Sequence, residues 1–307
     1  MKKIALTVEN LTKIYFDSKN KKENVALNNL NFKVNQGEVF GLLGPNGAGK
    51  TTFLSILAGT VSKTKGTVNV WGFDIDKNPR QVKASIGIVP QEINLDAFFS
   101  PKKLLELQAG LYGVTKKDRI TELILNMVAL ENEANAYSRN LSGGMKRRLL
   151  IAKAMVHQPP ILILDEPTAG VDIELRRSLW DFLIDINKAG TTIILTTHYL
   201  EEAENLCRNI AIIDEGQIIE NTKMSNLLQQ LENQVFSIET NAKLPENFSI
   251  EGFDTQVLDE NKFTVIVPKD VTINDLFDKS ELRTIEVANM KNQTNRLEEL
   301  FLNLTAK

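Results

Sequence analysis

The sequence contains little cysteine, little excess charge and no long apolar run. Cys207 is the only cysteine in 307 residues, so no intrachain disulfide can form and a reducing cytoplasm fits the chain. Lysine plus arginine number 36 and aspartate plus glutamate 39, a net charge of −3 that argues against non-specific nucleic-acid binding. No apolar stretch approaches the ~20 residues that cross a bilayer, and no signal-peptide core follows Met1. We therefore expect a chain that reaches a membrane only through a partner.

A glycine-rich loop lies between a predicted buried strand at 39–43 and a predicted helix that Gly59 stops. Glycines let backbone N–H groups turn towards a polyphosphate, and the helix N-terminus adds partial positive charge. Lys50 is expected to bind the β- and γ-phosphates, and the Thr51 hydroxyl to bind Mg²⁺. The alternative is a turn that only caps a helix. The predicted phosphate-binding residues are Gly44, Pro45, Asn46, Gly47, Ala48, Gly49, Lys50, Thr51 and Thr52.

Two carboxylates follow the apolar run at 161–164. Asp165 is expected to hold Mg²⁺, through water, and Glu166 to polarise the water that attacks the γ-phosphate. The alternative is a strand that ends in a solvated acidic turn.

A second anion-binding helix tip is predicted where Ser142 and two glycines begin a helix. Because one chain needs one cradle for each triphosphate, this tip indicates a nucleotide held by another copy. The alternative is an ordinary helix cap that leaves residues 146–148 as a solvated basic face. The residues of the tip are Leu141, Ser142, Gly143, Gly144 and Met145.

Strands that alternate with helices predict a parallel sheet covered on both faces. Earlier strands are expected at 4–8, 30–34 and 67–70, with a turn at 18–24. Residues 92–157 form a predicted helical insert, with helices near 101–111 and 116–130. These segments make up a first domain over residues 1–232.

A smaller α+β domain is predicted over residues 233–307, with the order β-β-α-β-α. Its expected strands include 263–267 and 282–287, and its first helix 272–279. A last amphipathic helix carries Leu297, Leu300, Phe301 and Leu304.

Several of these segments resemble the ATP-binding subunit of an ABC transporter over about residues 4–230. They are residues 44–51, Gln91, residues 141–145, Asp165-Glu166, residues 169–172 and His198. In that order they match the Walker A, Q-loop, signature, Walker B, D-loop and switch histidine of the family. The resemblance implies a P-loop NTPase fold with a parallel-sheet core, an antiparallel β subdomain and a helical subdomain. It also implies ATP and Mg²⁺ as ligands.

The resemblance also assigns roles to single residues. Tyr15 matches the aromatic residue that stacks on adenine; the alternative is an aromatic residue of the core or the surface near a strand end. Gln91 would bind Mg²⁺ or water and sense the permease, and Asp172 would act across the dimer or only cap its helix. His198 would contact the γ-phosphate beside the catalytic Glu166 and Lys50. Met145 replaces the usual glutamine, as is common in exporters.

The wording of the motifs is most similar to ATPases of ABC-2-type exporters, and within them to the YadG-like branch. That resemblance implies a homodimer closed head-to-tail around two ATP molecules. It also implies a separate membrane permease and a peripheral place on the cytoplasmic face of the membrane. The alternatives are a soluble ABC ATPase that transports nothing, the ATPase of an importer, and an ATP-gated binding module.

Overall fold

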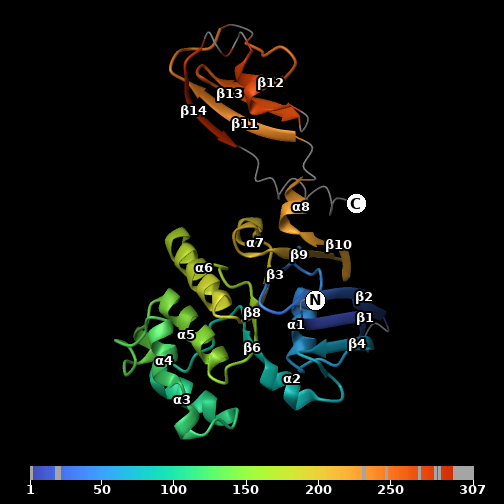
Figure 1. Ribbon diagram of the computed structural model, residues 1–307, viewed down its shortest axis with the longest axis vertical. Helices are drawn as coiled ribbons and strands as arrows, with labels where there is room; N and C mark the ends of the chain where they lie inside the picture. The colour runs from blue at the N-terminus through green and yellow to red at the C-terminus, as the bar shows by residue number, and fades with distance from the viewer. Residues whose placement is uncertain are drawn as a thin grey trace. The chain divides into compact units, whose positions relative to one another are not determined.

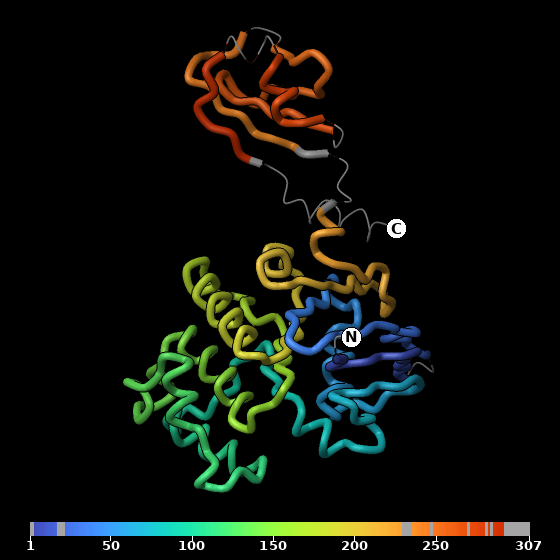
Figure 2. Tube along the Cα trace, in the orientation of Figure 1, coloured from blue at the N-terminus to red at the C-terminus, as the bar shows by residue number. Residues whose placement is uncertain are grey.

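The computed structural model describes residues 3–17, 22–229, 233–245, 248–268, 271–279, 282 and 285–292. The chain divides into two compact units, Met1–Lys223 and Met224–Lys307. Figure 1 labels the elements of each unit, and Figure 2 follows the same path as a tube. Among the described residues, every helix is too short or too polar to span a bilayer.

A six-stranded sheet forms the centre of the first unit (Figure 1). Its strands β3, β6, β7, β8 and β9 are parallel, and β10 pairs antiparallel with β9. The strand β3 and most of β7 and β8 are buried, as a parallel sheet with covered faces requires. In spatial order the strands are β10 (Gln217–Lys223), β9 (Asn209–Asp214), β3 (Val39–Leu43), β8 (Thr192–Thr197), β7 (Ile161–Asp165) and β6 (Ile86–Val89).

A second, antiparallel sheet shares its core with the first through the helix α1 (Lys50–Leu57). Phe53 of α1 meets the Phe32 ring edge-on, and Phe32 stacks on Phe40 of β3. Two strands are longer than expected because they form one hairpin, and residues 22–24 of the predicted turn belong to β2; residues 18–21 lie outside the described residues. The strands are β2 (Lys22–Asn35), β1 (Ile4–Asp17), β4 (Lys65–Val70) and β5 (Phe73–Asp74).

The helical insert has its own core, built around Leu105, Leu125 and Leu149. The helix predicted at 116–130 is a 3-10 turn (Lys116–Asp118) followed by the shorter α4. The other helices of the first unit are α2, α6 and α7. The bounds are α2 (Pro79–Ser85), α3 (Pro101–Leu111), α4 (Thr121–Met127), the second 3-10 turn (Ser138–Asn140), α5 (Gly143–Met155), α6 (Ile173–Lys188) and α7 (Leu200–Leu206).

The second unit contains a four-stranded antiparallel sheet with the order β12-β13-β11-β14. The sequence missed β12, whose mostly exposed residues carry little of the core. The strand predicted at 282–287 is wrong, because β14 begins only at Val287. The predicted last helix with Leu297 lies outside the described residues. The elements are α8 (Met224–Gln229), β11 (Asn233–Thr240), β12 (Asp254–Asp259), β13 (Lys262–Pro268), α9 (Ile273–Phe277) and β14 (Val287–Asn292).

Candidate nucleotide site

The glycine loop leaves β3 and enters α1 by a path that side chains would block. Gly49 has φ +110°, and a Cβ there would lie 2.7 Å from the Ala26 carbonyl oxygen. A Cβ at Gly44 would lie 2.3 Å from the Ile213 carbonyl oxygen. Both close approaches hold the loop against neighbouring strands. The helix α1 begins directly after Gly49, which makes no side-chain cap, and the first N–H groups of a helix have no partner within it.

The Lys50 ammonium is buried at the centre of this loop. Its Nζ donates to the carbonyl oxygens of Gly44 (2.6 Å) and Pro45 (3.1 Å) and lies 3.9 Å from Oε1 of Glu166. Burial lowers the pKa of Lys50, while the carboxylates of Glu166 and Asp165 oppose that shift. A poorly solvated ammonium of this kind gains strongly from contact with a phosphate anion.

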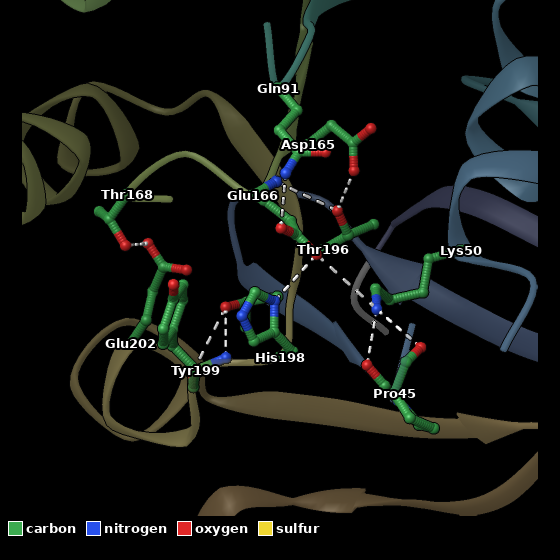
Figure 3. Close-up of polar contacts among 12 residues, drawn as sticks. Pro45, Lys50, Gln91, Asp165, Glu166, Thr168, Thr196, His198, Tyr199 and Glu202 are labelled. Carbon is green, nitrogen blue, oxygen red and sulfur yellow. Dashed lines mark hydrogen bonds and ion pairs between the residues drawn. The ribbon is translucent and has the colours of Figure 1, made fainter. Parts of the chain in front are cut away.

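Glu166 lies directly after β7 in a left-handed conformation, with φ +43°. Its N–H donates to the carbonyl oxygen of Thr196 at 3.1 Å. The Nε2 of Gln91 donates to its Oε2 at 2.9 Å, and Nδ1 of His198 lies 3.0 Å from its Oε1 (Figure 3). The structure therefore brings Lys50, Gln91, Glu166 and His198 together from four distant segments.

Oxygen atoms suited to a magnesium ion lie beside this cluster. The Thr196 hydroxyl donates to Oδ1 of Asp165 at 2.5 Å, and Thr51 lies in the wall of the adjoining cavity. No group of three or more His, Cys, Asp or Glu side chains suited to a metal occurs in the described part of the chain. A Mg²⁺ ion here would draw on the Asp165 carboxylate, the Thr51 hydroxyl, the Gln91 amide oxygen and phosphate oxygens, and one or two carboxylates with substrate phosphates are typical Mg²⁺ ligands.

A cavity of about 770 Å³ opens above the loop. Tyr15 forms one wall, is 38% exposed, and has the Lys13 Nζ 4.6 Å from its ring centre. Gly44 and Ala48 are buried at the base of the loop. The predicted residues that line the cavity are Tyr15, Pro45, Asn46, Gly47, Gly49, Lys50, Thr51, Thr52, Gln91, Glu166 and His198.

The helix tip at Ser142 lines a different cavity, of about 580 Å³, together with Gly143, Gly144 and Asp172. Ser142 and Gly143 are exposed, and the Ser142 hydroxyl caps α5 by accepting from the Met145 N–H at 3.3 Å. Asp172 caps α6 by accepting from the Leu175 N–H at 2.9 Å. The structure therefore does not bring this tip to Lys50 within one chain, although Gln91 lines both cavities.

Sequence reasoning missed Arg147, which it left inside a candidate solvated face. Arg147 is 4% exposed, and its guanidinium donates to five backbone carbonyl groups. A signal was present, because Arg147 falls three residues after Gly144 and four before Ile151 on the buried side of α5. His157 stacks on Tyr112 with ring centres 3.7 Å apart.

Comparison with known proteins gives consistent matches. A family model described as ABC transporter matches residues 27–169. The Nod factor export ATP-binding protein I of Cupriavidus metallidurans is 41% identical over 73% of this chain and 72% of its own length. The linearmycin resistance ATP-binding protein LnrL of Bacillus subtilis is 34% identical over 98% of both chains.

A solved structure extends the likeness to three dimensions. A dimeric ATP-binding cassette, bound to ADP and phosphate in a post-hydrolysis state, matches with a TM-score of 0.62 and 26% identity. The match covers 71% of this chain and 98% of the cassette. The predicted fold class is confirmed by these matches together with the two sheets and the helical insert of the first unit.

Proposed function

We propose that this chain powers an ABC-2-type exporter whose permease is a separate chain. The chain belongs to the ATP-binding subunits of ABC transporters and is an ATPase. Similarity to proteins named for Nod factor export and linearmycin resistance supports the direction of transport. Membership of the YadG-like branch stays a prediction. The residues that contact the transported substrate would belong to the permease.

Dimerisation is supported above all by the separation of the two anion-binding elements. The loop around Lys50 lines one cavity, and the exposed tip at Ser142 lines another. In a head-to-tail pair, each ATP would lie between the loop of one copy and the tip of the other. ATP would close the pair and ADP would release it, because only the γ-phosphate spans both surfaces.

The contacts in the cavity support distinct roles in hydrolysis. Glu166 accepts a proton from water as the water oxygen attacks the γ-phosphorus. The bond between the γ-phosphorus and the β–γ bridging oxygen breaks, and ADP and phosphate leave. His198, 3.0 Å from the same carboxylate, orients Glu166 and reaches the γ-phosphate. Lys50 binds the β- and γ-phosphates. Thr51, Gln91 and Asp165 would hold Mg²⁺, which when bound neutralises phosphate charge.

A groove beside Gln91 supports contact with a permease. It measures about 370 Å³ and is lined by Ile88 and Pro90, just before Gln91, and by Tyr112 and Leu150 of the helical insert. Leu111, at the end of α3, is 83% exposed. A partner segment that filled the groove and covered Leu111 would bury apolar surface, which favours association. A permease segment docked here would move with the helical insert when the dimer closes.

The decisive experiment is the substitution Glu166→Gln. Steady-state phosphate release should fall about 100-fold or more because the general base is lost. The variant should still bind ATP, and the ATP-bound protein should accumulate as a closed dimer in size-exclusion chromatography. Glu131→Gln, an exposed carboxylate of the helical insert, is the matched control and should hydrolyse ATP normally. Normal hydrolysis by Glu166→Gln would rule out the assigned base.

A second experiment separates the transporter from a soluble ATPase or an importer. The full chain should co-purify with a permease that carries no ATP-binding cassette of its own. In vesicles that contain both chains, the substrate should move away from the face that holds the ATPase. Uptake towards that face would favour an importer, and failure to bind any permease would favour a soluble ATPase.

A further inference from the structure

Arg147 uses every hydrogen-bond donor it has inside the protein. Its Nε donates to the carbonyl oxygen of Pro167 at 2.8 Å. Its Nη1 donates to Pro90 at 2.8 Å and Gln91 at 2.9 Å, and its Nη2 to Glu166 at 2.9 Å and Asp165 at 3.2 Å. An arginine carries five N–H donors in a rigid fork, so this side chain is fully satisfied. Bonds from a charged donor are about twice as strong as neutral ones.

The five carbonyl groups belong to two segments at the ends of neighbouring parallel strands. Pro90 and Gln91 follow β6, whereas Asp165 ends β7 and Glu166 and Pro167 follow it. The side chains of Gln91 and Glu166 hydrogen-bond to each other at 2.9 Å and line the cavity above the loop. Arg147 thus joins the main chains of the same two residues whose side chains that hydrogen bond joins.

The conformation of Glu166 makes this support consequential. Its φ of +43° is unfavourable for a residue with a Cβ, by roughly 1–2 kcal/mol. Such a conformation persists only where surrounding contacts fix it, and the Glu166 carbonyl oxygen is fixed by Arg147. Burial lowers the pKa of Arg147, while the carboxylates of Glu202 and Asp165 oppose that shift.

Arg147 also belongs to the helix that carries the signature tip. It lies in the second turn of α5, whose first residue follows Ser142. A displacement of that tip would therefore pull on both catalytic segments through one rigid side chain.

We propose that Arg147 is a positioning residue for ATP hydrolysis, which holds the main chains of Gln91 and Glu166 in register with each other and with the helix tip at Ser142. The proposal rests on the catalytic role proposed above for Glu166. A purely structural arginine would affect folding alone, whereas a positioning residue changes the rate of the chemical step in a folded protein that still binds ATP.

The test compares Arg147→Met and Arg147→Lys with Arg80→Met and Arg80→Lys. Arg80 is an exposed arginine of α2, away from both cavities. We expect kcat to fall about 10–100-fold in Arg147→Met, since small misplacements of catalytic groups have effects of that size. In Arg147→Lys, kcat should fall less than in Arg147→Met, because the lysine ammonium keeps the charge and replaces part of the hydrogen-bonding fork. KM, binding of a fluorescent ATP analogue and the control variants should stay near wild type.

The outcomes are distinguishable even if one variant misfolds. If Arg147→Met fails to fold, the folded Arg147→Lys protein decides. A wild-type kcat in a folded variant overturns the proposal, and so does a raised KM with unchanged kcat, which would indicate a role in binding.

A second readout separates this proposal from the dimer model. In the Glu166→Gln background, Arg147→Lys should still pair in the presence of ATP, because the loop and the tip are intact. Loss of pairing only in the double variant would overturn the positioning role. Failure of Glu166→Gln itself to pair would instead count against the proposed dimer.

Discussion

The cavity around Lys50 and the tip at Ser142 are both proposed to bind phosphate, but their residues are arranged in different ways. Lys50, Gln91, Glu166 and His198 contact one another within a single chain. The hydroxyl of Ser142 contacts its own helix, and Ser142 and Gly143 face solvent in a separate cavity. The difference teaches that the groups proposed for hydrolysis already contact one another in one chain, whereas the tip at Ser142 would need another copy to reach a nucleotide at Lys50.

Ser142→Arg breaks the tip and leaves the cavity intact. The added side chain and its charge block the helix N-terminus, so hydrolysis should fall about 100-fold, the cost typical of losing a catalytic anion contact. ATP should remain bound at Lys50, as measured by equilibrium binding. Ser225→Arg, in the first turn of α8, is the matched control at another exposed serine. Unchanged hydrolysis by Ser142→Arg would mean that the serine has no part in the composite site.

Gly144→Ala displaces the tip from its support on α6. The new Cβ would lie 2.3 Å from Cδ1 of Leu175, so the unfolding free energy should fall by about 1–3 kcal/mol in denaturant titrations. At Gly143 no atom lies within 4 Å of an added Cβ, so Gly143→Ala should keep its stability. Leu175→Ala should reduce the further loss caused by Gly144→Ala. Equal stability of the two alanine variants would contradict the packing argument.

Tyr15→Ala weakens the cavity and leaves the tip intact. Stacking on a base contributes about 1–3 kcal/mol, so the Kd for ATP should rise about tenfold or more. Tyr15→Phe keeps the ring and should bind as the wild type does. An unchanged Kd for Tyr15→Ala would favour the interpretation of Tyr15 as a surface aromatic.

Glu202→Gln alters a buried side chain that contacts the segment between Glu166 and Asp172. Oε1 of Glu202 accepts from the Thr168 hydroxyl at 2.9 Å, and Thr168 lies between Glu166 and the Asp172 loop. Burial raises the pKa of Glu202 above its ordinary value of 4.5, so protonation favours the folded state. That stabilisation is present below the ordinary pKa and is lost as pH rises through the raised one.

Glutamine cannot ionise and so avoids the cost of the buried Glu202 carboxylate charge. Glu202→Gln should therefore melt about 2–4 °C higher than the wild type near neutral pH. The difference in Tm should shrink as the pH is lowered towards the ordinary carboxyl pKa. A variant that melts lower at neutral pH would mean that the ionised carboxylate stabilises the fold.

Local sequence signals predicted most of the cavity. The glycines around Lys50, the apolar run before Asp165 and the cap at Ser142 each act within a few residues of themselves. The long β1–β2 hairpin and β12 were missed, because pairing with a distant strand stabilises residues whose own pattern is weak.

By itself, the sequence determined which groups we propose to bind phosphate and which carboxylates belong to the same site, since these predictions depend on short runs of fixed chemistry. Only the tertiary structure decided that Arg147 is buried and bonded to the carbonyl groups of Gln91 and Glu166, and that Glu166 takes a left-handed conformation. It also decided that Ser142 and Lys50 line separate cavities within one chain. The physical reason is that burial, hydrogen-bond partners and distance between segments arise from contacts between residues far apart in the chain, and no local pattern carries them.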